Sequence, residues 1–190
     1  MAYNPLAFGL LLIGTGALLF AAYLFDAKKK ISFQTEKNYG IIFSVLGFLA
    51  GIFGLGLYAF TPIPEQYIEV FGVGYLVFSF LSLVAGITLL TKSYRKPSVF
   101  LAGIGGVFLL GSACVIYSNQ LTRSPLASAA LFALAGLSSI GMIPYQFLKS
   151  KRLQKIIWIK LIIGFTLVGL LAIYTGLSAQ AGHVASILAG

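Results

Sequence analysis

Long apolar segments alternate with short polar segments along the whole 190-residue chain. Six apolar segments have a length close to the roughly 20 residues that a helix needs to cross about 30 Å of hydrocarbon. They are residues 5–25, 39–60, 70–90, 97–117, 125–148 and 156–174. They are too long and too little alternating for membrane β-strands. The pattern predicts an all-α protein, a polytopic integral membrane bundle of six transmembrane helices in one domain over residues 1–176. We expect the tail, residues 177–190, to be coil or a short interfacial helix.

The composition favours lipid over water as the surrounding solvent. Hydrophobic residues make up 59% of the chain and charged residues only 9%, and the mean hydropathy is +0.98. A soluble domain has about a quarter of its residues charged. We therefore expect a multi-pass protein of the cell membrane.

Basic residues lie almost entirely in and beside the loops that follow the odd-numbered spans. Twelve of the 13 are found there, namely Lys28, Lys29, Lys30, Lys37, Lys92, Arg95, Lys96, Lys149, Lys151, Arg152, Lys155 and Lys160. The remaining one is Arg123. Because loops rich in Lys and Arg are retained in the cytoplasm, the sequence predicts that both termini are extracytoplasmic.

A net charge of +9 would suggest nucleic acid binding in a soluble protein. Here the charges stand in short runs between membrane spans, so we expect the lipid bilayer and its anionic headgroups on the cytoplasmic side to be the partners. We expect no nucleic acid. The predicted headgroup anchors are Lys28, Lys29, Lys30, Arg95, Lys96, Lys151, Arg152, Trp158 and Lys160.

Each even-numbered span follows a basic loop and ends in an aliphatic–tyrosine pair. The pairs are Leu57–Tyr58, Ile116–Tyr117 and Ile173–Tyr174. One interpretation is three repeated hairpins that descend from one unit. The other is that a basic anchor and an interfacial aromatic residue lie one membrane thickness apart in any transmembrane helix.

Small residues recur at the four-residue spacing that places them on one helix face. Gly47 and Gly51 have this spacing in the second span, as do Ala102 and Gly106 in the fourth. Such faces let helix backbones approach closely. They predict tight packing inside one protomer or, alternatively, an interface between subunits.

Ionisable groups are absent from the middle of every predicted span, where they usually mark an ion or proton path. Two carboxylates, Glu65 and Glu69, stand four residues apart at the outer start of the third span. They are candidates for an outer vestibule that attracts cations. The alternative is that they only stabilise the positive end of the helix dipole.

The chain offers few groups for catalysis or for a cofactor. His183 is the only histidine and Cys114 the only cysteine. Metal, haem and nucleophilic sites generally need several such residues close together. We therefore expect no enzyme activity, no metal and no cofactor.

The stretch from Gly56 to Gly72, followed by Gly86 to Leu90, carries a Tyr, Pro-x-Pro, Tyr and Phe-Gly pattern that leads into the third span. In this pattern the chain resembles a family of small prokaryotic membrane proteins catalogued as a domain of unknown function. The resemblance covers most of the chain and implies the six-span fold, but it implies no activity.

Six spans, this length and both termini outside are also similar to the urea and amide channel family. Residues 9–14 and the pair Phe71–Gly72 are similar to that family's sequences. That family has several pore tryptophans and an acidic residue in its last span. This chain has only Trp158, and residues 161–174 contain no acid.

Two functional hypotheses follow. The first is a non-catalytic structural or accessory subunit of a homo-oligomer or a larger membrane complex, because the spans lack reactive groups. The alternative is a passive channel or facilitator for a small neutral solute, which needs no charge at the midplane. Its predicted polar lining is Tyr75, Ser79, Ser82 and Ser112.

Overall fold

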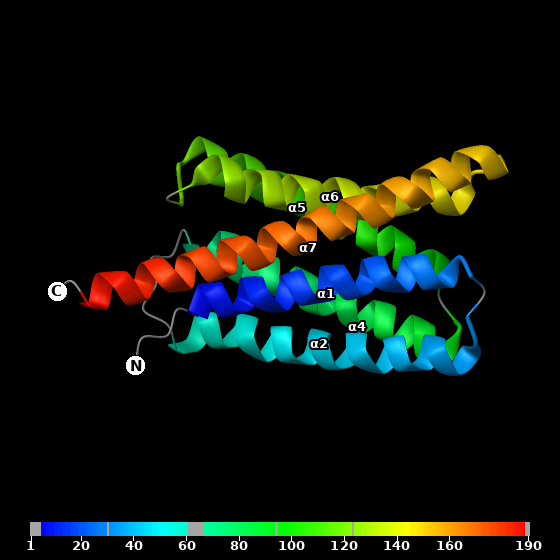
Figure 1. Cartoon of the computed structure of the whole chain (residues 1–190), viewed down its shortest axis with the longest axis horizontal. Helices are drawn as coiled ribbons and strands as arrows, with labels where there is room; N and C mark the ends of the chain where they lie inside the picture. The colour runs from blue at the N-terminus through cyan, green and yellow to red at the C-terminus, as the bar shows by residue number, and fades with distance from the viewer. Residues whose placement is uncertain (1–4, 30, 61–66, 94, 123, 189–190) are drawn as a thin grey trace.

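The computed structural model describes residues 5–29, 31–60, 67–93, 95–122 and 124–188, and it is all-α over this part of the chain. Its membrane-length helices are α1 (Pro5–Ala27), α2 (Phe33–Phe60), α4 (Val73–Thr91), α5 (Arg95–Ser118), α6 (Pro125–Phe147) and α7 (Lys151–Leu188) (Figure 1). A π-helical turn, η1 (Ile68–Gly72), leads directly into α4. Together they form six candidate membrane spans, so the predicted fold class is confirmed.

The outer surface of the bundle explains why the helices are apolar on all sides. Large apolar side chains point outward, among them Ile104 with 67% and Leu126 with 71% of its surface exposed. A helix that is hydrophobic all round belongs in a membrane or in a large core. Because most of the surface of these side chains is not covered by the bundle, lipid is their natural solvent.

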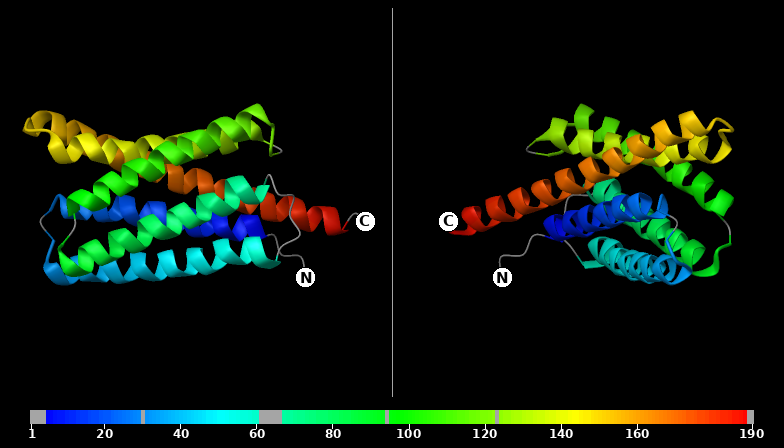
Figure 2. Two further views of the ribbon diagram at one scale, coloured as in Figure 1. Left: turned by 180° about the vertical axis from the view of Figure 1, so that it is seen from behind. Right: turned by 45° about the vertical axis from the view of Figure 1, so that its right-hand side comes forward.

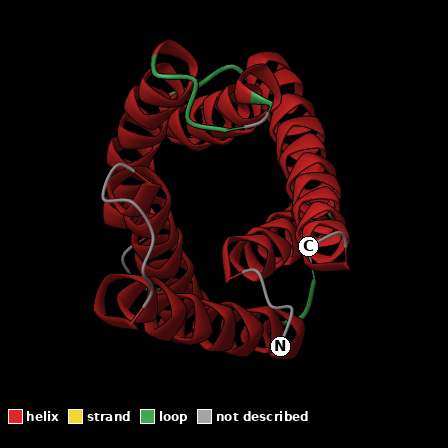
Figure 3. Ribbon diagram, turned by 90° about the vertical axis from the view of Figure 1, so that its left-hand side faces the viewer, coloured by secondary structure: helices red, strands yellow, loops and turns green. Residues whose placement is uncertain are grey.

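The six long helices form a ring. Neighbours follow one another in the order α2, α4, α5, α6, α7 and α1, and α1 closes the ring against α2. Figure 3 views the bundle along the axis of the ring and shows the helices arranged around this axis. The most extensive packing joins three pairs, α2 with α4, α5 with α6, and α1 with α7.

The two ends of the ring differ in charge. α1 begins and α7 ends at one end, where α2 and α5 also end (Figure 1). We call this the terminal end. At the other end α4 gives way to α5 and α6 to α7, and the described basic residues cluster in or near these connections and the one after α1. We call this the basic end.

Close glycine contacts hold the three extensive pairs together. In each pair, a Cβ added to either of two facing glycines would lie within 3.0 Å of the carbonyl oxygen of the other. The facing glycines are Gly14 and Gly169, Gly40 and Gly86, and Gly106 and Gly136. For Gly106 and Gly136 the distance is 2.6 Å in both directions. Only glycine permits backbones to approach so closely.

The extensive pairs are not the helices that the basic loops connect. α1 and α2, α4 and α5, and α6 and α7 follow one another at the basic end, yet they pack less extensively. If the chain contains a repeat, its structural unit is therefore an even-numbered span with the odd-numbered span that packs against it. For the last span, α7, that partner is α1 from the other end of the chain.

The last helix is longer than predicted. The expectation that a coil or a separate short helix starts near residue 177 is wrong, because α7 continues unbroken from Lys151 to Leu188. Packing against α1 supports this part of the helix, since a Cβ on Gly176 would lie 2.9 Å from the carbonyl oxygen of Ala7. The 38 residues span about 57 Å at about 1.5 Å per residue. α7 therefore projects beyond the other helices at the terminal end (Figures 1 and 2).

Candidate functional site

The terminal half of the ring has a solid centre. Its axis is filled by a terminal plug of buried side chains, which we define as Leu10, Phe71, Tyr75, Ile116, Leu131, Phe132, Val168 and Ala172. Ile116 and Ala172 are completely inaccessible. The rings of Phe71 and Phe132 meet edge-on with centroids 5.8 Å apart, which joins α6 to the turn before α4. The plug therefore packs α1, α4, α5, α6 and α7 together in the terminal half.

Tyr75 anchors this plug to the first helix. Its hydroxyl donates a hydrogen bond to the carbonyl oxygen of Leu6 at 2.8 Å. Its ring contacts that of Phe53, with the ring centroids 5.6 Å apart. The same ring lies directly over Gly9, where a Cβ would clash with it. The hydroxyl is thus used for packing between α4 and α1.

The basic half of the ring is hollow. A cavity of about 520 Å³ extends from the plug toward the basic end, and all six long helices contribute to its wall. This volume lies within the range of small-molecule sites, about 300 to 1,000 Å³. Near the basic end its wall includes Glu36, Thr88, Ser98 and Gln146. The cavity is therefore apolar beside the plug and more polar near the basic end, and we call this second part its mouth.

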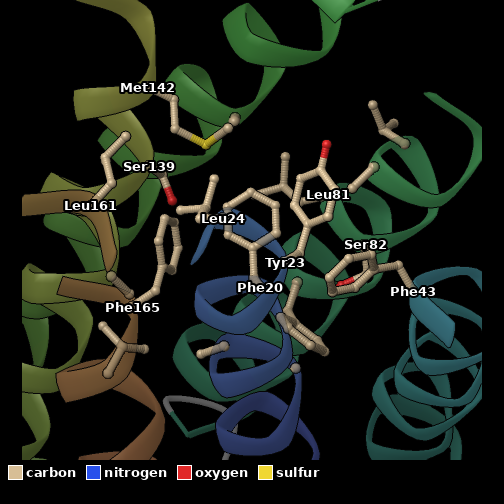
Figure 4. A pocket seen from close by; sticks show the side chains of 18 of the residues that line it. Phe20, Tyr23, Leu24, Phe43, Leu81, Ser82, Ser139, Met142, Leu161 and Phe165 are labelled. Carbon is tan, nitrogen blue, oxygen red and sulfur yellow. The ribbon is translucent and has the colours of Figure 1, made fainter. Parts of the chain in front are cut away.

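The wall of the cavity is mainly aromatic and aliphatic (Figure 4). The ring of Phe20 packs edge-on against the rings of Phe165 and Phe43, with centroids 4.8 Å and 5.7 Å apart. These contacts bring α1, α7 and α2 together. Hydroxyl groups of Ser82 and Ser139 interrupt this surface. Glu36 is the only charged side chain among the described lining residues. Such a wall suits an uncharged, mostly apolar molecule that can make a few hydrogen bonds.

Two contacts shape the mouth. The hydroxyls of Thr88 and Ser98 lie 2.6 Å apart and link α4 to α5 across a less extensive helix contact. Tyr145 of α6 packs on Trp158 of α7 with ring centroids 4.7 Å apart. The indole nitrogen Nε1 of Trp158 is buried and has no hydrogen-bond partner in the described structure.

Of the four residues predicted to form a polar lining, the structure places one at the cavity wall. Ser82 lines the cavity, but Tyr75 belongs to the plug. The hydroxyl of Ser79 donates to the carbonyl oxygen of Gly47 at 2.7 Å, between α4 and α2. Ser112 is buried outside the cavity. The physical reason is that a hydroxyl in an apolar environment is often satisfied by a backbone carbonyl.

The predicted packing residues divide between two places. Gly47 and Gly51 face Ser79 of α4, and Gly106 faces Gly136 of α6, so all three lie in contacts inside one chain. Ala102 lines the cavity instead. Its small side chain leaves space in the centre of the ring.

The predicted vestibule cannot be assembled from the described residues. Glu65 lies outside them, and Glu69 is exposed in the π-helical turn at the terminal end, away from the cavity. A role for this pair stays a prediction.

Most predicted headgroup anchors are exposed at the basic end. These are Lys28, Lys29, Lys96, Lys151, Arg152 and Lys160. Lys30 lies outside the described residues, and only the backbone of Arg95 is described. Trp158 differs from the prediction, because it packs on Tyr145 and forms part of the cavity wall.

Sequence reasoning missed most of the cavity wall, including Phe20, Phe43, Ser139 and Phe165. Hydrophobic periodicity carries little signal here, since lipid and the bundle interior both accept apolar side chains. The density of aromatic residues in the first two spans was the only available signal.

A family model matches residues 1–186, and the chain belongs to that family, which is described as Protein of unknown function (DUF981). Among curated proteins and among solved structures, none matches the chain. The comparisons thus agree with the resemblance to a family of unknown function and lend no support to the likeness to urea and amide channels.

Proposed function

We propose that this member of the DUF981 family is a non-catalytic membrane facilitator for a small, mainly apolar and uncharged solute. The observation that carries this proposal is the central cavity, which lies between the terminal plug and the basic end. A bundle that served only as a scaffold would not need a hollow of this size, because membrane proteins as well as soluble proteins gain stability from close packing.

The chemistry of the wall supports an uncharged solute. A charged molecule in an apolar cavity would need opposite charges or many hydrogen bonds to replace its water. The described wall offers several hydroxyls but only one charged side chain, Glu36 at the mouth. Aromatic rings such as Phe20 and Phe165 offer dispersion contacts to an apolar solute.

We further propose that the basic end faces the cytoplasm, because Lys and Arg are retained on that side. The mouth of the cavity would then lie toward the cytoplasm. A single cysteine introduced as Lys29→Cys in a Cys114→Ala background should react only with a thiol reagent supplied from the cytoplasmic side. Reaction from the outside alone would reverse the orientation.

Transport is tested by filling the cavity. Ala102→Trp places a large ring in the cavity wall, whereas Gly111→Trp on the same helix adds it where a Cβ meets nothing within 4 Å. Proteoliposomes of the unmodified protein should equilibrate at least one solute of a neutral panel faster than empty liposomes. Ala102→Trp should abolish this difference and Gly111→Trp should keep it. Equal rates with and without protein for the whole panel would refute the facilitator.

The projecting end of α7 favours a second candidate, an accessory subunit of a complex. Just before this end, beside Gly176, Tyr174 and Leu177 are 69% and 57% exposed. A partner that covers them would appear in the mass of the protein isolated from native membranes in mild detergent. A bare monomer would remove this candidate.

A further inference from the structure

A second, smaller hollow lies beside the mouth of the cavity. It measures about 240 Å³ and is lined by Ala27, Lys28, Tyr145, Lys151, Gln154, Lys155 and Trp158. We call it the basic hollow. It lies where the end of α1, the last turns of α6 and the first turns of α7 come together.

Three lysines surround this hollow without an acidic partner. Lys28 follows α1, while Lys151 and Lys155 stand four residues apart and therefore share one face of α7. Among the described residues, the ion pair found at this end of α1 joins Lys29 to Asp26 at 4.0 Å. The part of the chain that the structure describes contributes no carboxylate to the wall of the hollow. Three positive charges thus surround a space that is ready to accept an anion.

The uncharged side chains of the wall are fixed by contacts of their own. Trp158 packs on Tyr145 with ring centroids 4.7 Å apart. The side-chain amide of Gln154 donates to the carbonyl oxygen of Leu148 at 2.7 Å, which holds that side chain in place. The hollow also lies at the beginning of α7, the positive end of its helix dipole. The three lysines and the helix start both favour an oxyanion with several acceptor oxygens.

We propose that the basic hollow binds the phosphate group of an anionic lipid. The hollow lies at the end of the transmembrane helices, where lipid headgroups lie. Ile156 and Ile159 follow Lys155 along α7 toward the membrane interior, are 42% and 41% exposed, and offer an apolar surface to an acyl chain. A free phosphate ion would use the same donors but not this apolar surface.

The basic hollow shares part of its wall with the cavity. Ala27, Tyr145 and Trp158 line both. A phosphate group bound in the hollow would therefore lie beside residues that also form the cavity wall. The lipid site itself does not depend on the facilitator proposal, because its ligand contacts the lysines whether or not a solute enters the cavity.

The test uses the fluorescence of Trp158, the only tryptophan in the chain. The full-length protein is placed in phosphatidylcholine nanodiscs with increasing phosphatidic acid, or inorganic phosphate is added to discs without it. We expect a saturable change with phosphatidic acid and a much weaker one with inorganic phosphate at equal concentration. An equal response to inorganic phosphate would overturn the lipid as the source.

A charge-matched pair of variants separates a built site from general attraction. Lys151→Gln with Lys155→Gln removes two lysines from the hollow. Lys149→Gln with Arg152→Gln removes two exposed charges of the same segment that lie outside it. The first double variant should weaken phosphatidic acid binding by at least about tenfold, and the second by less than about twofold.

Equal weakening in both double variants would show general electrostatic attraction and refute the site. Ala102→Trp alters the cavity and leaves the hollow's residues unchanged, so it should lose solute transport and keep phosphatidic acid binding. In the unmodified protein, normal phosphatidic acid binding without solute transport would refute the facilitator alone, while transport without lipid binding would refute the hollow alone.

Discussion

The terminal and basic halves of the bundle are built from the same six helices, but only one of them is filled. In the terminal half, large side chains such as Phe71, Ile116 and Phe132 meet at the axis. In the basic half the axis is lined partly by small residues such as Ala102 and Ser139, which leave a cavity. The three glycine contacts lie between paired helices and not at the axis. Pairing can therefore hold the ring together while its centre stays open.

This difference is possible because the forces that pack helices together in lipid differ from those in water. In water, burial of apolar surface drives side chains into a common core, and large voids are rare. In a membrane, helices associate mainly through van der Waals contact and hydrogen bonds. Contacts such as that of Gly106 with Gly136 supply this attraction locally. The comparison predicts that stability depends on the helix pairs and the plug, and that function depends on the cavity.

The largest expected effect comes from breaking a helix pair. Gly106→Leu places a side chain against the backbone of α6, where even a Cβ would lie 2.6 Å from the carbonyl oxygen of Gly136. We expect the free energy of unfolding to fall by about 3 kcal/mol, the upper part of the usual range for overpacking. It can be measured by titration with sodium dodecyl sulfate in mixed micelles. Gly111→Leu, on the same helix with open space around it, should change it by less than about 0.5 kcal/mol. Equal losses would mean that the pairs do not control stability.

A smaller effect should separate two adjacent serines of α6. Ser138 packs against Gly164 of α7, and Ser139 faces the cavity, although both are more than 90% buried. Ser138→Leu should lower the free energy of unfolding by about 2 kcal/mol, because α7 leaves no room. Ser139→Leu should lower it by less than about 1 kcal/mol, because the side chain enters empty space. Thermal unfolding in detergent would show which variant is less stable. If Ser139→Leu were the less stable one, the cavity would not lie on the side of α6 that Ser139 faces.

The smallest of these effects concerns the plug. Tyr75→Phe removes the hydroxyl that donates to the carbonyl oxygen of Leu6 and keeps the ring in place. One buried hydrogen bond contributes about 1 kcal/mol, so the melting temperature should fall by a few degrees at most. Tyr174→Phe, at a side chain that is 69% exposed, should have no effect. If Tyr75→Phe were also silent, the hydroxyl would not anchor the plug to α1.

The sequence predicted the membrane spans well, because span length and charge are local properties. The third span was expected at residues 70–90 and occupies Ile68–Thr91, and the fifth was expected at 125–148 and occupies Pro125–Phe147. The end of the last span was missed, because the contact of Gly176 with α1 comes from the opposite end of the chain.

The cavity could not be predicted in the same way. Ser79 and Ser82 stand three residues apart on α4, yet one bonds to Gly47 and the other lines the cavity. Nothing in their local sequence distinguishes the two serines, because the environment of each depends on which neighbouring helix its face contacts. Trp158 was expected in the interface on composition grounds, but its contact with Tyr145 places it at the mouth.

The pairing of α1 with α7 has a consequence for biosynthesis. During synthesis the first span enters the bilayer well before its principal neighbour has left the ribosome, and the faces around Gly14 and Gly169 meet only after translation has reached the final span. Until then the barrel-like assembly has an unclosed seam, whereas the pairs α2–α4 and α5–α6 can form earlier from consecutive segments. A nascent chain truncated before residue 151 would therefore expose one side of its first helix to quality-control proteases.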